Sequence, residues 1–312
     1  MVLTIFRYCN ILADLISTDG RNLKNVRARI AKGKGIINRI FNILEILPLG
    51  KHYFEVGMNA EAWYNMTNAE LDLLETIDLI FLRKLLKAPK NTPKEMLFLE
   101  LGCIPFRKII MEKRISFLHY ILNQDINSII FKFFKTQMEK RTKRDWVSTV
   151  IKDLELMGIK LEMEQIKAMK KSDFMRMIKD KIQTQTFQDM EKIKISHTKV
   201  KYVKHENIKM QKYLQANSCK ITQEEAQLIF KLRSRTINVK RNLKGMYDNL
   251  DCTACGTEEE TQEHVLKCKE LNKNRENNNI EYEKLFNGTV NDKLMIAKAF
   301  KENYDLLENM KK

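Results

Sequence analysis

The chain has 312 residues, of which 44% are hydrophobic and 31% are charged, and its formal net charge at pH 7 is +16. This length allows two domains with buried cores, and the composition is that of an ordinary globular protein. The sequence holds no apolar run of about 18 residues, so we expect no membrane-spanning helix and no membrane partner. So large a positive charge attracts polyanions, of which nucleic acid is the usual one.

The cysteines and the first residues indicate the compartment. Cys9, Cys103 and Cys219 are widely separated, which is typical of a reducing compartment rather than of a disulfide framework. The apolar start of the chain is interrupted by Arg7 and Asp14 and has no basic leader, so we expect no signal peptide. These features predict an intracellular protein.

The glycine and proline content predicts the fold class. Ten glycines, four prolines and few alternating apolar patterns predict a mainly α-helical chain. The exception is residues 11–20, where a short apolar run closed by Asp19-Gly20 predicts a strand and a turn. Helices are predicted over residues 25–47, 69–86, 106–122, 126–139 and 146–157, and others begin near residues 93, 173, 223 and 292. The lysine-rich residues 192–204 have little apolar content and predict a linker.

Several helix ends are marked by capping residues. Three pairs have the spacing of a capping box, in which a Thr hydroxyl and a Glu carboxylate each accept a backbone N–H of the other residue. The pairs are Thr67 with Glu70, Thr92 with Glu95, and Thr222 with Glu225. Single caps are predicted at Asp145, at Ser172-Asp173 and at Asn291-Asp292, and helix ends at Gly102 and Gly158.

Four metal-ligating residues fall within one short window. Cys252, Cys255, His264 and Cys268 have the pattern C-x2-C-x8-H-x3-C, which supplies the three thiols and one imidazole of a tetrahedral zinc site. The first two lie in a tight turn that ends at Gly256, and the last two are one helical turn apart, so their side chains point the same way. Since the protein fills all four positions, we expect the zinc (Zn) to be structural and not catalytic. The alternative is a turn with buried thiols and a surface histidine.

Two basic segments are candidate contacts for nucleic acid. The first lies in the helix predicted over residues 25–47 and consists of Arg27, Arg29, Lys32 and Lys34. The second lies in residues 226–247, which hold no acidic residue and lead into the metal window; it consists of Lys231, Arg233, Arg235, Lys240, Arg241 and Lys244. The metal window itself is rich in glutamate, so we expect zinc to fix the backbone and the preceding segment to contact phosphates. A solvated basic helix face is the alternative.

Five stretches of the sequence carry a resemblance to a known family. They are residues 11–22 (ILADLISTDGRN), 29–40 (RIAKGKGIINRI), 73–105, 230–235 (FKLRSR) and 261–268 (TQEHVLKC). Together they resemble the C-terminal part of a non-LTR (LINE-type) retrotransposon reverse transcriptase, in the family's order and over nearly the whole chain. Ala13 departs from the pattern, in which a glycine is expected.

The resemblance implies an organisation and a partner. Residues 1–20 would be a remnant of the polymerase palm edge, 21–104 a thumb-like helical region, 105–250 a helical linker, 251–268 a CCHC zinc knuckle and 269–312 C-terminal helices. The four metal-window residues match the family's zinc ligands. The implied partners are RNA template and target DNA, with no small-molecule substrate, and the implied location is the nucleus.

Residues for catalysis are missing from this sequence. Two-metal nucleotidyl transfer needs carboxylates that hold two divalent ions, and the family supplies them as an adjacent Asp pair. The chain contains no Asp-Asp, no Pro-Asp and no G-x-S-x-G. We therefore expect a fragment that is not an enzyme by itself and that binds nucleic acid. Two alternatives stay open: a helical protein-interaction scaffold with its partner surface at residues 71–101, and a non-functional fragment of a decayed element.

Overall fold

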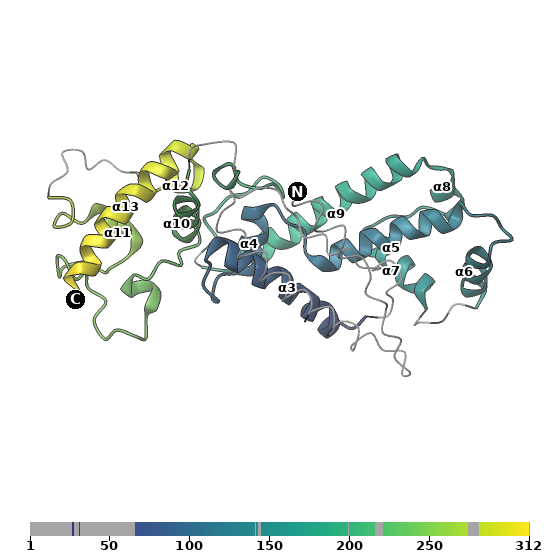
Figure 1. Cartoon of the computed structure of the whole chain (residues 1–312), viewed down its shortest axis with the longest axis horizontal. Coiled ribbons are helices and arrows are strands. Elements are labelled where there is room, and N and C mark those ends of the chain that lie inside the picture. Colours follow the sequence, from purple (N-terminus) through teal and green to yellow (C-terminus); the bar gives the residue numbers. More distant parts are fainter. Residues whose placement is uncertain are drawn as a thin grey trace. The chain divides into compact units, whose positions relative to one another are not determined.

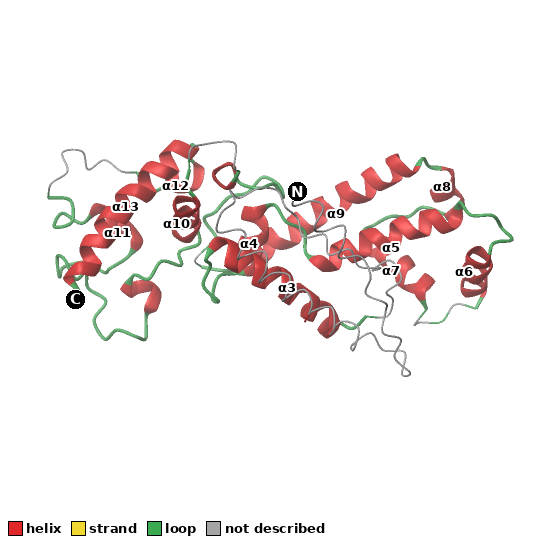
Figure 2. Ribbon diagram, viewed as in Figure 1, coloured by secondary structure: helices red, strands yellow, loops and turns green. Residues whose placement is uncertain are grey.

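The computed structural model describes residues 66–311, except 141, 143, 144, 199, 216–220 and 274–280, together with Arg27 and Ala31. Within this described part the chain is mainly helical and contains no strand, only two isolated β-bridges (Figure 2). The prediction of a mainly α-helical chain is confirmed to that extent. The strand predicted over residues 11–20 and nearly all of the helix predicted over 25–47 lie outside the described residues.

The described chain forms two compact units, which we treat separately (Figure 1). Unit 1 takes in residues 66–81 and 104–189, and unit 2 takes in residues 82–103 and 190–311. The helices α3 (Asn68–Leu86) and α9 (Lys171–Ser196) each contribute residues to both units. The remaining helices of unit 1 are α5 (Phe106–Leu122), α6 (Ile129–Glu139), α7 (Trp146–Leu156) and α8 (Met163–Ala168).

Unit 1 is built around α5, which packs against α6, α7 and α8. Its core is apolar, and Ile115, Ile166 and Phe174 within it are fully buried. The one buried ion pair of α5 with α7 joins Arg114 to Asp153 at 2.7 Å, with both side chains 7% exposed. Because both charges are paired, this polar contact can be held inside the core.

Unit 2 holds the remaining elements. These are α4 (Lys94–Leu101), η2 (Lys212–Leu214), α10 (Gln223–Arg233), η3 (Lys240–Leu243), α11 (Gln262–Lys267), α12 (Lys284–Asn287) and α13 (Val290–Met310). The long helix α13 packs against α10, α11 and α12. The helix α4 is buried along nearly its whole length, from Glu95 to Leu101.

Glu100 on α4 is the centre of a fully buried polar network in unit 2. One oxygen, Oε1, accepts from Arg233 Nη2 at 2.8 Å and from His205 Nε2 at 3.0 Å, and the other accepts the hydroxyl of Tyr213. Arg233 Nη1 donates to the carbonyl oxygens of Leu285 and Phe286 at 2.7 and 3.1 Å. Burial alone would raise the pKa of Glu100, but the Arg233 guanidinium and the His205 ring hold it well below its usual range.

The backbone beside this network comes unusually close to Gly102. Gly102 ends α4 in the left-handed region with φ 65°, and a β-bridge pairs Leu101 with Met210. A Cβ added at Gly102 would lie 2.2 Å from the backbone nitrogen of Met210. Both the dihedral angle and the contact therefore require glycine at this position.

Three predicted caps are confirmed. Thr67 and Glu70 exchange side-chain and backbone hydrogen bonds at the start of α3. Thr222 forms a complete capping box with Glu225 at the start of α10. Asp145 accepts from the Ser148 N–H at 2.7 Å and caps α7, and Gly158, with φ 63°, follows the end of that helix.

Three predicted caps are wrong: those at Thr92 and at Asn291-Asp292, and the one at Ser172-Asp173, which lies inside α9. The helix α4 has Pro93 as its N-cap and begins at Lys94, so Thr92 lies one residue too early. The buried Thr92 hydroxyl has no hydrogen-bond partner among the residues that the structure describes. The last helix is capped by Thr289 through a capping box with Asp292, two residues before the predicted Asn291. That Thr-x-x-Asp spacing was present in the sequence.

The boundaries of three other predicted segments shift. The helix α6 begins at Ile129, after the N-cap Ser128, and not at residue 126. The helix α9 begins at Lys171, so Ser172 and Asp173 lie within its first turn. It continues to Ser196, so the linker predicted over residues 192–204 is partly helical. Lys194 in this segment is only 1% exposed, because its amine bonds to Glu191 and to the Val203 carbonyl.

Replacing Glu100 with Gln should strongly destabilise unit 2, because it leaves the Arg233 charge buried without its partner. We expect a loss of about 3–5 kcal/mol in the free energy of unfolding, measured by urea titration with circular dichroism. The matched control is Arg241→Ala, which breaks a pair with Glu259 that is 47% exposed on both sides and should change stability by at most about 1 kcal/mol. Equal effects of the two variants would contradict the central role of Glu100.

Asp78 should make the stability of unit 1 depend on pH. Burial and then the Glu75 charge raise the pKa of Asp78 to about 7, although its carboxylate accepts the N–H of Phe106 at the start of α5. Because the folded state favours the protonated form, this contribution is full below about pH 4 and is lost as the pH rises to about 7.

Asp78→Asn should therefore raise the urea midpoint at pH 7 and reduce the fall in stability between pH 4 and 7. Asp72→Asn is the control, since Asp72 is 64% exposed and pairs with Arg107 at the surface. An unchanged pH profile in Asp78→Asn would show that this carboxylate is not the titrating group.

Candidate metal centre

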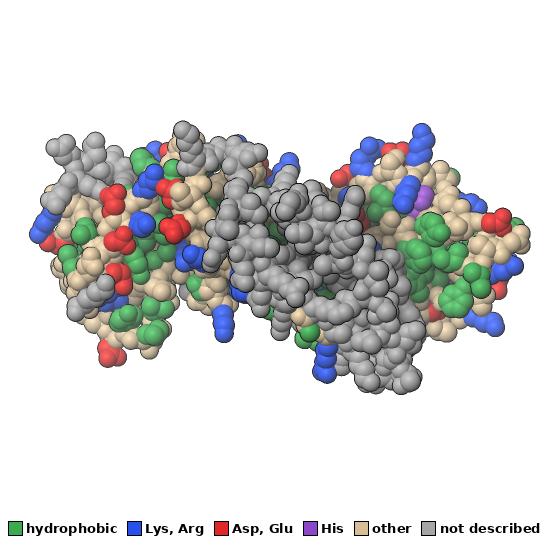
Figure 3. All heavy atoms as spheres, viewed as in Figure 1, with side chains coloured by type: hydrophobic (Ala, Val, Ile, Leu, Met, Phe, Trp, Pro, Cys, Tyr) green, Lys and Arg blue, Asp and Glu red, His purple; other side chains and the backbone are tan. Residues whose placement is uncertain are grey.

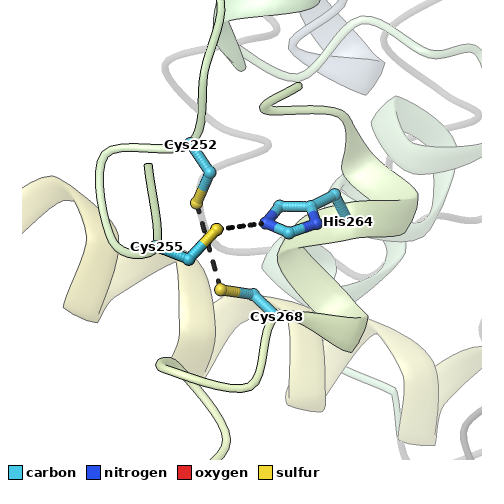
Figure 4. Close-up of side chains that lie close together, drawn as sticks. All are labelled: Cys252, Cys255, His264 and Cys268. Carbon is cyan, nitrogen blue, oxygen red and sulfur yellow. Dashed lines mark hydrogen bonds between the residues drawn. The ribbon is translucent and has the colours of Figure 1, made fainter. Parts of the chain in front are cut away.

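The four residues of the predicted zinc site come together in unit 2. Their ligand atoms, three sulfurs and one imidazole nitrogen, all lie within 4.8 Å of one another. Figure 4 shows the four side chains pointing toward a common centre, with Cys255 Sγ 3.3 Å from His264 Nε2 and Cys252 Sγ 4.0 Å from Cys268 Sγ. The spacing C-x2-C-x8-H-x3-C thus correctly predicted that these four side chains lie together.

A tight turn places the first two cysteines. The Cys252 N–H donates to the Glu258 carbonyl at 2.7 Å, and the Gly256 N–H donates back to the Cys252 carbonyl at 2.8 Å. Gly256 has φ 69°, a left-handed conformation that glycine adopts without steric cost. The chain therefore reverses within a few residues, and both sulfurs lie on the inner side of the turn.

The short helix α11 places the other two ligands. Thr261 caps it by accepting the His264 N–H at 3.0 Å, and the Cys268 N–H closes the final turn on the His264 carbonyl. His264 Nδ1 lies 3.1 Å from a carboxylate oxygen of Glu258. This contact orients the ring with Nε2 toward the thiols, as carboxylates do for metal-bound histidines.

The distance between the Cys252 and Cys268 sulfurs is close to that of two ligands of one zinc ion. Tetrahedral zinc with zinc–sulfur distances of about 2.3 Å places two sulfur ligands about 3.8 Å apart. The 4.0 Å between Cys252 and Cys268 Sγ needs only a small adjustment to reach that value. Three thiolates and a neutral imidazole are also the donors that zinc prefers, and with four protein ligands no position is left for substrate.

The two cysteines of the turn differ in acidity. Burial raises the pKa of the Cys252 thiol to about 11, whereas a hydrogen bond from the Thr257 hydroxyl lowers the pKa of the Cys255 thiol to about 6. At neutral pH, Cys255 is therefore available as a thiolate, and Cys252 must release its proton when a metal binds.

The metal window is held within the fold of unit 2 by buried polar side chains. Glu260, fully buried, accepts from the Lys240 N–H at 3.1 Å and from the Lys311 amine at 2.8 Å. Gln262 donates to the Leu232 carbonyl on α10 at 3.0 Å, and Asn303 on α13 donates to the Val265 carbonyl at 2.8 Å. Sequence reasoning missed these residues, since no local pattern marks a side chain whose partners are distant in sequence.

The residues predicted to contact nucleic acid differ in burial and in their partners. Arg233 is the clear correction: it is 0% exposed and bound to Glu100, so it is a core residue and not a phosphate contact. Arg235 pairs with Glu263 and Arg241 with Glu259, and the Lys240 amine donates to the Asp251 carbonyl. Lys231 is half-buried and Lys244 is exposed. Of the first basic segment, Arg27 is exposed, and Arg29, Lys32 and Lys34 lie outside the described residues.

No helix in the described residues combines the length and apolar character that crossing a bilayer requires. Comparisons with protein-family models, with curated proteins and with solved structures give no match to this chain.

The purified chain should contain one zinc ion, measured by elemental analysis. Cys268→Ser should lose the ion and lower the thermal stability of the region around α11, because ligand binding and local folding are coupled. Cys103→Ser is the control, since Cys103 lies outside the cluster and its sulfur contacts the Leu101 carbonyl. Zinc content unchanged in Cys268→Ser would contradict the assignment of that ligand.

Proposed function

We propose that this chain is a zinc-stabilised, helical nucleic-acid-binding module related to the C-terminal part of a LINE-type reverse transcriptase. The convergence of Cys252, Cys255, His264 and Cys268 carries the proposal, because the resemblance assigns zinc to these four residues. The net charge of +16 supports a polyanionic partner. A closed zinc site has no open coordination position, which favours a binding role over a catalytic one.

Lys231 and Lys87 are the phosphate contacts that we favour in unit 2. Both line a groove of about 650 Å³, whose walls include residues of α10 and α13. Burial lowers the pKa of Lys231. The nearby positive charge of Lys87 lowers it further, because the two like charges repel each other. A bound phosphate would relieve this repulsion. Glu224, Glu225, Glu302 and Asp305 also line the groove, as do Lys298 and Lys301. We place the phosphate beside Lys87 and Lys231, which lie close enough for their charges to interact.

The alternative of a protein-interaction scaffold places the partner surface at residues 71–101. It is less favoured for the second half of that range. The helix α4 supplies the residues from Lys94 to Leu101, and its apolar side chains from Met96 onward are at most 2% exposed. They form the interior of unit 2 and are not a surface for a partner. We propose no polymerase activity for the chain alone, since its sequence lacks the Asp-Asp pair, and no nuclease activity, since it also lacks Pro-Asp.

Binding of the zinc-loaded chain to a duplex or single-stranded oligonucleotide should weaken steeply with salt, since it releases counterions from phosphates. The double variant Lys87→Gln with Lys231→Gln should weaken binding and lower the slope of log K against log salt by about 0.9 per lost contact on duplex DNA. Fluorescence anisotropy across a salt series measures both quantities.

Lys267→Gln is the matched control, because Lys267 is exposed among the glutamates of the metal window. It should change the affinity and the salt slope less than the double variant of the two groove lysines. Affinity that does not change between low and physiological salt would count against nucleic-acid binding.

A further inference from the structure

A second surface, in unit 1, has the composition of a site for unpaired bases. Lys113, Ser116, Phe117 and Tyr120 occupy positions i, i+3, i+4 and i+7 of α5, so they share one face of that helix. Together with Lys171, the first residue of α9, they line an open groove of about 430 Å³. We call this the aromatic–lysine groove. Its volume is in the range of small-ligand sites, about 300–1,000 Å³.

The aromatic rings of this groove are held in a fixed arrangement. The rings of Phe117 and Tyr120 are nearly parallel, with 12° between their planes and 5.8 Å between their centroids. Trp146 contacts Phe117 edge to face at 5.6 Å and restrains that ring from the side of α7. Tyr120 is 46% exposed, so part of a large aromatic side chain stays open to a ligand.

The two charged side chains that line the groove are both positive. Lys113 and Lys171 line it, and neither forms an ion pair with any residue in the part of the chain that the structure describes. Figure 3 shows the hydrophobic side chains that gather over the end of unit 1 carrying α5, α6 and α7, with lysine or arginine side chains nearby. Two amines beside an exposed ring can bind the phosphates of a nucleotide whose base stacks on that ring.

We propose that the aromatic–lysine groove binds single-stranded nucleic acid, with a base stacked on Tyr120 and flanking phosphates on Lys113 and Lys171. Unpaired bases are favoured over a duplex, because bases in a duplex already stack on one another and are not free to contact a protein ring. Nucleic acid is favoured over a protein partner, because lysine is depleted at the cores of protein interfaces. This inference rests on the proposed function and adds a site in unit 1, with residues that no earlier argument used.

The test uses the full zinc-loaded chain and a fluorescent 12-nucleotide oligouridine, with binding followed by anisotropy. Tyr120→Ala should weaken binding by about 5- to 150-fold, the range for loss of one stacked base. Tyr120→Phe keeps the ring and should retain the wild-type affinity within about twofold. Lys113→Gln with Lys171→Gln should lower the salt slope by about 0.7 per lost phosphate contact. Circular dichroism and zinc content verify that each variant is folded.

The outcomes separate this inference from the proposed function. If the wild type binds the oligonucleotide and Tyr120→Ala binds it equally well, the groove is not the site, and nucleic-acid binding still stands. If the wild type binds neither oligouridine nor duplex DNA, both proposals fall. If Tyr120→Ala loses binding to phosphatidylserine vesicles and not to oligouridine, the groove is a membrane contact and the inference is overturned.

Discussion

The buried pair of Glu100 and Arg233 is the constraint on which unit 2 depends. A charge taken out of water is tolerated only when it is paired and its remaining hydrogen-bonding groups are satisfied. Here one carboxylate receives Arg233, His205 and Tyr213, and the guanidinium reaches two carbonyl groups near the end of α12. The network thus fixes α4, α10, α12 and the segment around residues 205–213 in one arrangement, because no member can move without leaving another unsatisfied.

The candidate metal centre is built onto this same framework. Arg233 is the last residue of α10, and the carbonyl of its neighbour Leu232 accepts from Gln262, which opens α11. The helix that holds Arg233 in the core therefore also positions the helix that carries His264 and Cys268. A zinc ion bound there would join the Cys252–Cys255 turn to a helix already fixed by other contacts. This arrangement favours a metal that completes the fold over one that carries out chemistry.

Sequence reasoning succeeded where the interactions are local. The capping boxes at Thr67 and Thr222 and the four metal ligands depend on spacings of a few residues, which the sequence displays directly. It failed for Arg233 and Lys194, whose partners are tertiary: Glu100 is 133 residues from Arg233, and no local pattern reveals their contact. The second basic segment, residues 231–244, therefore predicted exposed phosphate contacts throughout. The fold buries one of these charges, Arg233, against Glu100. The aromatic–lysine groove was missed for the same reason, because Lys171 reaches it from a different helix.

Gly102 offers a way to recognise selection on this fold. Any side chain at this position would collide with the Met210 backbone, so nearly every change at its codon that alters the amino acid should disable unit 2. In a coding sequence that is no longer under selection, such changes would accumulate at codon 102 at the same rate as anywhere else. Retention of glycine across divergent related sequences, beside freely varying surface codons, would be the signature of a protein that is still translated and still useful.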